Sequence, residues 1–173
     1  MSTLNEISME PLSMESLSFN PFTKIGKEWM LITAGNEEKA NTMTASWGGL
    51  GVMWGKNVVF VVIRETRYTK EFIDNNDTLS LTFLSEEYRS ALNYLGTVSG
   101  RDENKIEKAG LHLSYANGVP YLAEGKMVLT CKKMSATPIT PDQFLDDTIE
   151  EKWYKDGNLH TLYIGEITSV LSE

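Results

Sequence analysis

Short apolar runs, alternating or continuous, dominate the chain and predict strands more often than helices. Residues 41–47 (NTMTASW) alternate small polar with apolar residues, which is typical of a strand whose two faces differ. As a strand, this segment places Thr42, Thr44 and Ser46 on one face, which therefore carries hydroxyl groups. Residues 58–63 (VVFVVI) contain no polar side chain and are β-branched at five of six positions, which favours a strand buried on both faces.

Runs of the same kind predict the remaining elements. We expect further strands at residues 29–34, 78–84, 121–123, 126–134 and 159–171, the first of which forms a hairpin with residues 41–47. The predicted helices are 69–75 with Thr69 as N-cap, 86–95 closed by Gly96, and 99–109 opened by a capping box of Ser99 and Asp102. At least six strands against two or three short helices favour a mainly β protein, an antiparallel barrel with peripheral helices.

The length of 173 residues suits a single domain with one core. Residues 1–20 are rich in Ser, Met and Glu and show no firm period, so we expect an N-terminal arm that is flexible or docks on a partner subunit. Residues 21–173 then form the folded domain.

The overall charge and the scarcity of metal-binding side chains exclude several protein classes. A net charge of −8 argues against general nucleic-acid binding, which requires a basic face. The single cysteine, Cys131, excludes an intrachain disulfide and a thiolate-rich metal site, and two histidines leave little material for another metal site. No apolar run reaches the roughly 18 residues of a membrane helix, and the N-terminus does not resemble a secretory signal. We therefore expect a cytoplasmic protein that binds no metal, membrane or nucleic acid.

Two basic segments stand out against this acidic background. Residues 64–70 (RETRYTK) bring three cations and two threonines together at the end of the buried strand. Guanidinium and ammonium groups, hydroxyls and helix N–H groups are the partners that a phosphate needs. Arg101 and Lys105 can converge on the same anion. The alternative is an exposed strand end whose arginines pair with surface carboxylates.

Other residue patterns narrow the chemistry further. The glycines at 48, 49 and 51 let the main chain approach a ligand closely. The chain contains neither a G-x-G-x-x-G unit nor a G-x-x-x-x-G-K-[ST] loop, and it offers few acid–base residues. A phosphate-bearing ligand that brings its own reactivity, such as a cofactor, fits this pattern.

Three segments together resemble the motifs of a known family: N-T-M-T-A-S-W-G-G, R-E-T-R-Y-T and S-G-R-D-E-N-K. They are similar to the flavin reductase-like family of FMN-binding split-barrel proteins, and most closely to its flavoredoxin-type branch. The similarity runs from about Phe22 to the C-terminus. It implies an antiparallel six-stranded split β-barrel, a homodimer with FMN near the subunit interface, and electron transfer through the flavin.

The resemblance also implies roles for individual residues. The flavin ring would lie along the first segment, at Thr42, Thr44, Ala45, Ser46 and Trp47. The phosphate would be held by the second segment, through Arg64, Arg67 and Thr69. The third segment would close over the phosphate with Ser99, Gly100 and Lys105. Family reductases carry a G-D-H segment whose histidine lies near the nicotinamide. Here it reads Asn158-Leu159-His160, so His160 is either part of that site or a structural residue at a strand edge.

Three functions follow as hypotheses. The leading one is an FMN-containing oxidoreductase that takes electrons from NAD(P)H or a protein donor and passes them to flavin or another acceptor, with Trp47 or Trp54 beside the ring. The second is an electron carrier without a nicotinamide site. The third is a structural dimer whose basic pocket holds another phosphate compound, such as pyridoxal phosphate.

Overall fold

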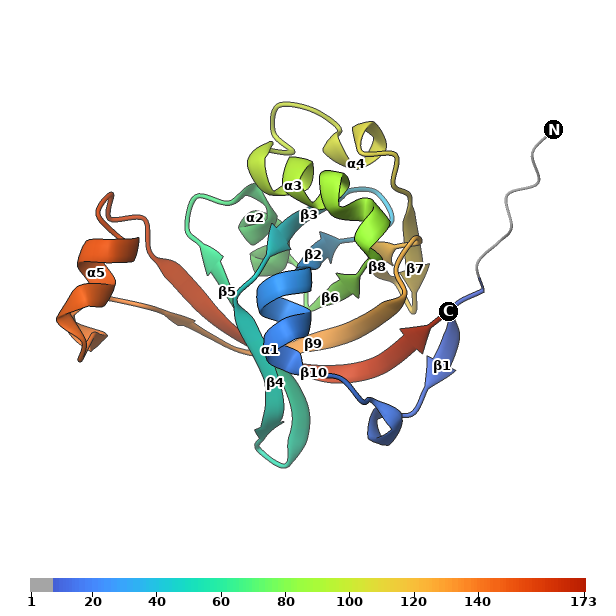
Figure 1. Ribbon diagram of the computed structural model, residues 1–173, viewed down its shortest axis with the longest axis horizontal. Helices are drawn as coiled ribbons and strands as arrows, with labels where there is room; N and C mark the ends of the chain where they lie inside the picture. The colour runs from blue at the N-terminus through green and yellow to red at the C-terminus, as the bar shows by residue number, and fades with distance from the viewer. Residues whose placement is uncertain (1–7) are drawn as a thin grey trace.

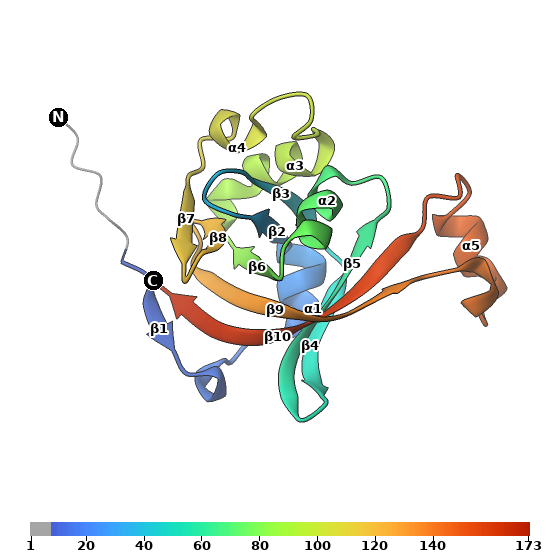
Figure 2. The ribbon, with the colours of Figure 1, turned by 180° about the vertical axis from the view of Figure 1, so that it is seen from behind.

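One antiparallel sheet of eight strands forms the body of the protein (Figures 1 and 2). The computed structural model describes residues 8–173. Seven strands follow one another in the order β3-β2-β6-β9-β10-β5-β4, and β1 pairs with β10. The strands are β1 (Glu10–Leu12), β2 (Met30–Gly35), β3 (Ala40–Ala45), β4 (Gly48–Met53), β5 (Lys56–Arg64), β6 (Thr78–Phe83), β9 (Met127–Pro138) and β10 (His160–Ser172), with β7 (Leu113–Ala116) and β8 (Val119–Leu122) as a separate hairpin.

The sheet curls into a barrel that stays open along one side. Its two end strands, β3 and β4, are connected by Ser46 and Trp47 alone, so the two ends of the sheet must come close together. Gly48 makes this step with a φ of +149°, and a Cβ there would lie 2.5 Å from the Phe60 carbonyl oxygen. Only glycine fits such a close approach. The predicted antiparallel split barrel is confirmed. The sheet has eight strands and not the expected six, because the glycine run forms β4 and residues 10–12 form β1.

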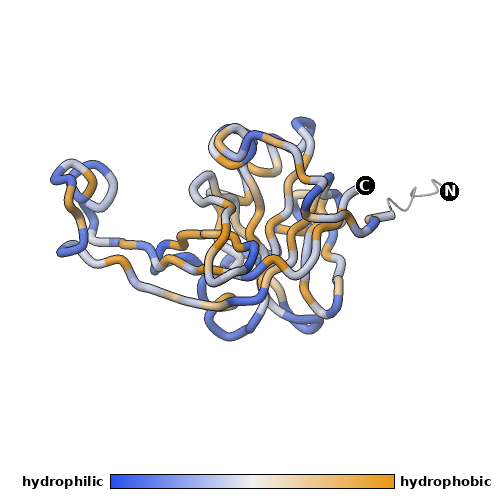
Figure 3. The backbone as a smooth tube through the Cα atoms, turned by 90° about the horizontal axis from the view of Figure 1, so that it is seen from below, coloured by the Kyte–Doolittle hydropathy of each residue, from blue (hydrophilic) through white to orange (hydrophobic). Residues whose placement is uncertain are grey.

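Two clusters of apolar side chains stabilise this arrangement. The larger one fills the barrel and includes Ile32, Val61 and Tyr163, together with Cys131, which is fully buried as a strand residue. The smaller one joins Leu31 on the outer face of β2 to the helices above it. In Figure 3 the hydrophobic residues concentrate in the body of the molecule.

Three helices lie beside the sheet near the end of β3 (Figure 1). Helix α2 (Tyr68–Asn75) matches the prediction, but Arg67 occupies its N-cap position and Thr69 is buried in its first turn. Helix α3 (Arg89–Thr97) follows a short 3-10 turn, Glu86–Tyr88, and runs one residue past Gly96. The predicted helix 99–109 is wrong: only α4 (Lys105–Lys108) forms, capped by Asn104, because Ser99 and Gly100 lie in a loop against β3.

The connection between β9 and β10, residues 139–159, projects from the body and is called the α5 loop (Figures 1 and 3). It contains a 3-10 turn (Pro141–Gln143) and α5 (Asp147–Trp153). A 3-10 turn (Met14–Ser16), α1 (Pro21–Thr23) and a π-helical turn (Lys24–Glu28) lead from β1 into β2, and α1 lies over the middle of the body beside β4 (Figure 1).

The predicted N-terminal arm falls only partly within the described chain. Its residues 1–7 lie outside the described residues, whereas residues 10–12 pair with residues 170–172 of β10. Leu17 and Phe19 pack against the barrel core. None of the helices in residues 8–173 has the length and apolar character that a membrane crossing requires.

Candidate functional site

Two adjoining cavities open where the barrel is split. The first, of about 310 Å³, is called the cation cavity, and the second, of about 140 Å³, the aromatic cavity. The two share Met43, Arg64 and Arg67 as lining residues. The outer edge of β3 pairs with no other strand of residues 8–173, and β4 pairs with β5 only as far as Val61. The cavities therefore lie between unpaired strand edges, where main-chain groups can contact a ligand.

Lys105 is the most buried charge in the cation cavity, with 3% of its surface exposed. Its ammonium donates hydrogen bonds to the carbonyl oxygens of Leu95 at 2.9 Å and Val98 at 3.0 Å. Burial, and then the charge of Arg67, lowers the Lys105 pKa to about 8. A buried ammonium held only by neutral carbonyls leaves a net positive charge facing the cavity.

Two arginines add to this charge. Arg67 donates from Nη1 to the Gly96 carbonyl oxygen at 3.0 Å, and burial together with the charge of Arg64 lowers its pKa. Arg64 donates to the carbonyl oxygens of Asn158 at 2.6 Å and Trp153 at 3.3 Å. Within residues 8–173, neither arginine nor Lys105 forms a salt bridge with a carboxylate. Three cations that share one cavity without a carboxylate match an anionic ligand.

The other predicted cations lie elsewhere. Arg101 pairs with Glu71 at 2.7 Å and covers the Tyr68 ring at 4.7 Å, so its expected convergence with Lys105 is wrong. Lys70 pairs with Asp74 at 2.8 Å. Both are surface ion pairs. The alternative interpretation placed the arginines of the basic segment in such pairs, but Arg64 and Arg67 form none within residues 8–173.

Polar groups complete the wall of the cation cavity, which Thr69, Ser99 and Gly100 all line. Asn41 donates from Nδ2 to the Thr69 hydroxyl at 2.9 Å. A Cβ on Gly100 would lie 2.2 Å from the Asn41 Oδ1, so the loop can approach β3 this closely only with glycine.

The aromatic cavity takes its lining from the edge of β3 and the residues after it, namely Thr44, Ala45, Ser46 and Trp47, with His160 opposite. The Thr44 hydroxyl donates to the Leu92 carbonyl oxygen at 2.6 Å, which ties this edge to α3. The Trp47 ring lies 5.3 Å from the His160 ring and 4.9 Å, edge to face, from the Trp153 ring. The cavity therefore combines a strand edge with aromatic surface, which suits a planar ligand.

Two sequence predictions need correction. Thr42 lines neither cavity: its fully buried hydroxyl lies 2.9 Å from the Thr33 hydroxyl and donates to the Ile32 carbonyl oxygen. Trp54 lies at the tip of the β4–β5 hairpin, 55% exposed and away from both cavities. The family resemblance implied a ligand contact for Thr42, and the leading hypothesis placed Trp47 or Trp54 beside the ring. The strand pairing turns the side chains of Thr42 and Trp54 elsewhere.

His160 is buried at the start of β10, with 6% of its surface exposed. Its Nδ1 lies 2.8 Å from the Tyr154 hydroxyl, and it pairs with Arg64 across the strands. Burial first, and then the charges of Arg64 and Arg67, lower its pKa to about 4. The imidazole is therefore neutral at physiological pH and serves as a hydrogen-bonding group.

Several lining residues did not stand out in the sequence: Asn41, Met43, Val62, Thr97, Val98 and Asn158. Asn41 and Met43 occupy the strand face opposite the hydroxyls, and both faces contribute because the cavities lie along the edge of β3. Asn158 comes from the α5 loop, and only its place two residues before His160 marks it in the sequence.

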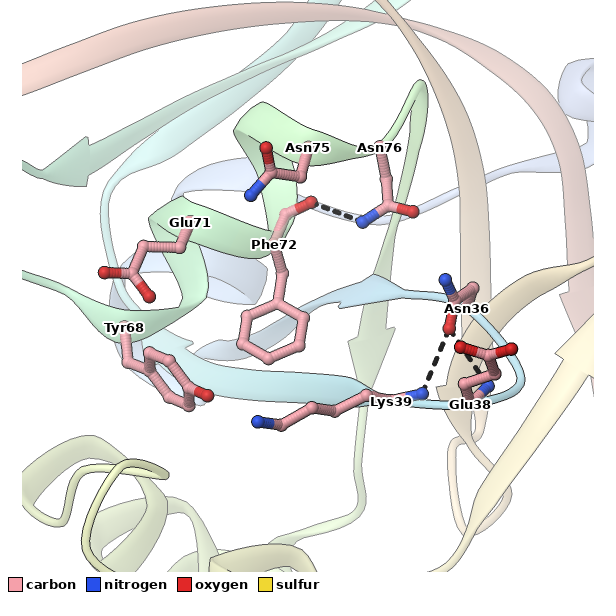
Figure 4. Close-up of a pocket in the computed structure, with 8 residues that line it drawn as sticks. All are labelled: Asn36, Glu38, Lys39, Tyr68, Glu71, Phe72, Asn75 and Asn76. Carbon is pink, nitrogen blue, oxygen red and sulfur yellow. Dashed lines mark hydrogen bonds between the residues drawn. The ribbon is translucent and has the colours of Figure 1, made fainter.

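A third cavity of about 310 Å³ lies between the β2–β3 turn and α2 (Figure 4). Tyr68 lines both this cavity and the cation cavity. Two carboxylates, Glu38 and Glu71, line it with one cation, Lys39, whose ammonium lies 5.6 Å from the Tyr68 ring centre. This balance of charge does not suit a phosphate, so the cation cavity remains the candidate anion site.

Comparison with known proteins identifies the family of this chain. The family model described as "Flavin reductase like domain" matches residues 22–173. A curated protein of Archaeoglobus fulgidus, described as uncharacterized, is 30% identical over 135 residues, which cover 77% of this chain and 66% of that protein. The chain thus spans slightly less than two thirds of this relative.

Solved structures share the fold. An FMN-binding domain of a flavin reductases-like enzyme from Shewanella baltica OS155 matches with a TM-score of 0.68 and 17% identity, covering 95% of this chain and 77% of that one. Flavoredoxins from Methanosarcina acetivorans and Desulfovibrio vulgaris (Miyazaki F) match with TM-scores of 0.65 and 0.66, each at 22% identity and covering 95% of this chain and 76% of theirs. With the family model matching nearly the whole described barrel, the chain belongs to the flavin reductase-like family, as its three sequence motifs predicted.

Proposed function

We propose that the chain binds FMN and acts as an oxidoreductase that receives electrons from NAD(P)H or a protein donor and passes them to flavin or another acceptor. The observation that carries this proposal is the group of three cations in the cation cavity, which have no carboxylate partner in residues 8–173 and adjoin a cavity lined by a strand edge and aromatic rings. The Shewanella relative is described as an FMN-binding domain, which supports the choice of ligand.

The two cavities would bind different parts of FMN. The FMN phosphate would be bound in the cation cavity by Arg64, Arg67, Thr69, Ser99, Gly100 and Lys105. The ring would lie against Thr44, Ala45, Ser46 and Trp47, with Thr42 acting only through the strand it stabilises. Bound FMN supplies reversible one- and two-electron transfer. Arg64 and Arg67, which line both cavities, favour negative charge on whatever occupies the aromatic cavity.

A second candidate, an electron carrier without a nicotinamide site, is favoured by one observation. The His160 imidazole is 6% exposed and bonded to Tyr154, while the Trp153 ring packs against Trp47. These contacts leave little of His160 available to a nicotinamide. The flavoredoxin relatives support this alternative by their names alone.

Titration of the purified protein with FMN tests the ligand assignment. Binding should produce a yellow protein and quench flavin fluorescence. A colourless protein that cannot be loaded with FMN but binds pyridoxal phosphate would favour the third hypothesis. Anaerobic mixing of the loaded protein with NADH and with NADPH then separates reductase from carrier, since only a reductase bleaches the flavin absorption at a catalytic rate.

Two further expectations are part of the proposal. We expect a homodimer, because large apolar side chains are exposed on the described surface, namely Phe22, Val52, Trp54 and Leu145. Sedimentation of the purified protein at several concentrations measures the oligomeric state. We also expect the protein to reside in the cytoplasm, which cell fractionation tests.

A further inference from the structure

The side chain of Asn158 reaches the cation cavity from the α5 loop. Its Nδ2 donates a hydrogen bond to the Thr66 hydroxyl at 2.8 Å, whereas its Oδ1 is buried and has no partner. No other side-chain nitrogen or oxygen that is buried within residues 8–173 lacks a hydrogen bond. An unpaired buried polar atom destabilises the fold, so this exception calls for a partner from outside the chain.

The surroundings indicate the chemistry of that partner. The Thr66 hydroxyl both donates and accepts, so the amide can turn over, keep its bond to Thr66 and place its NH₂ group where the unpaired oxygen now lies. The same cavity is lined by Arg64, Arg67 and Lys105, whose charges select an anion. An NH₂ group that joins three cations is a fourth donor for phosphate oxygens.

The main chain beside Asn158 is bound by the same site. Arg64 donates from Nη1 to the Asn158 carbonyl oxygen at 2.6 Å and from Nη2 to the Trp153 carbonyl oxygen at 3.3 Å. The Glu65 N–H donates to the Leu159 carbonyl oxygen at 2.9 Å. The base of the α5 loop is thus anchored on residues next to the cation cavity.

The same loop also forms part of the surroundings of the aromatic cavity. Trp153 packs edge to face on Trp47, and the Tyr154 hydroxyl contacts His160. A ligand group that binds both Asn158 and Arg64 therefore holds the loop at its base while Trp153 and Tyr154 contact the lining of the neighbouring cavity.

We propose that Asn158 is a phosphate ligand, and that phosphate binding through Asn158 and Arg64 fixes the α5 loop beside the aromatic cavity. The inference rests on the proposed anion site. It adds a residue that selects phosphorylated over unphosphorylated flavin. It also links the binding of phosphate to the position of the α5 loop.

Paired titrations with FMN and riboflavin test the contact. Asn158→Asp keeps the size of the side chain and its bond to Thr66 but places a carboxylate toward the phosphate, so FMN affinity should fall about tenfold or more while riboflavin affinity changes less than about twofold. Asn158→Ala should show a smaller loss of the same selectivity. Asn117→Asp is the matched control, because it makes the same charge change at an exposed position in the β7–β8 hairpin. Equal losses for the two flavins, or no loss, would overturn the assignment.

Thermal unfolding in inorganic phosphate tests the Asn158 contact without FMN. Phosphate should raise the melting temperature of the wild type and of Asn117→Asp, and should raise that of Asn158→Asp much less. If phosphate stabilises the wild type in this selective way but FMN does not bind, the Asn158 contact stands and the flavin proposal fails. If phosphate stabilises the wild type and Asn158→Asp equally, the Asn158 contact fails.

Limited trypsin digestion tests the link to the loop. Lys152 and Lys155 are exposed cleavage sites in the α5 loop. In the wild type, FMN should slow cleavage at these sites and riboflavin should not. In Asn158→Asp, FMN should give no such protection, even at concentrations that saturate the variant. Equal protection of the variant and the wild type would show that the loop is held without Asn158.

Discussion

Arg67 and Lys105 bind the same helix end: Arg67 donates to the Gly96 carbonyl oxygen at 3.0 Å, and Lys105 donates to those of Leu95 and Val98 at 2.9 and 3.0 Å. Carbonyl groups at the C-terminal end of a helix carry partial negative charge and favour cations. The end of α3 thus holds two like charges in fixed positions without using a carboxylate. This leaves both charges available to an anion, which is the basis of the proposed phosphate site.

Arg67→Ala should weaken FMN binding by about 1–3 kcal/mol, the usual effect of losing a hydrogen bond to a charged group. Fluorescence quenching titrations measure this loss. Arg101→Ala is the matched control, because Arg101 pairs with Glu71 outside the site and its side chain is 44% exposed. The control should bind FMN as the wild type does, and equal effects in the two variants would place the phosphate elsewhere.

FMN affinity should decrease as the pH rises through about 8, the value to which burial and Arg67 lower the Lys105 pKa. Above this pH the free protein loses the Lys105 proton, so phosphate binding must restore it, and affinity falls by up to about tenfold per pH unit. Titrations between pH 7 and 9.5 measure the slope. Lys105→Met should bind more weakly at pH 7 and lack this step, and a wild type with the same flat profile would contradict the role of Lys105.

Gly100→Ala should reduce both stability and FMN affinity. The added Cβ would lie 2.2 Å from the Asn41 Oδ1, so the loop or Asn41 must move, and the bond from Asn41 to Thr69 is strained or lost. Overpacking of this kind costs about 1–3 kcal/mol. Urea denaturation and FMN titration measure the two effects. Gly26→Ala is the control, because a Cβ at Gly26 meets nothing within 4 Å; a tolerated Gly100→Ala would show that the loop is not held closely.

Stability should decrease as the pH falls from about 6.5 toward 4 because of His160. Its pKa is 6.5 when unperturbed and about 4 in the folded protein, so over this interval unfolding takes up a proton. The stabilisation is complete above pH 6.5 and is lost as the pH falls through the folded pKa, with a size of roughly 1–3 kcal/mol. Denaturant unfolding at pH 7, 6 and 5 measures it. His160→Gln, which cannot titrate, should show a smaller slope, and identical slopes would refute the assignment.

Much of the fold was readable from local patterns. The alternating run at 41–47 and the apolar run at 58–63 correspond to β3 and β5, and the hairpin with β2 forms as expected. The capping box at Ser99 was misleading, because the loop around Gly100 packs against Asn41, a contact that lies far away in sequence. The glycines after Trp47 gave no strand signal in the sequence but belong to β4, since pairing with β5 outweighs the weak strand preference of glycine.

The sequence by itself determined the family, the barrel class and the basic segments that carry the candidate site, because strand periodicity, glycine positions and clustered charges are local properties. Only the tertiary structure decided which of these groups face one cavity. Lys105 joins Arg64 and Arg67 there, Arg101 turns to Glu71 instead, and Asn158 enters from the α5 loop. The physical reason is that the position and ionisation of a side chain depend on burial and on hydrogen bonds to residues distant in sequence, and these arise only when the strands pair and the helices pack.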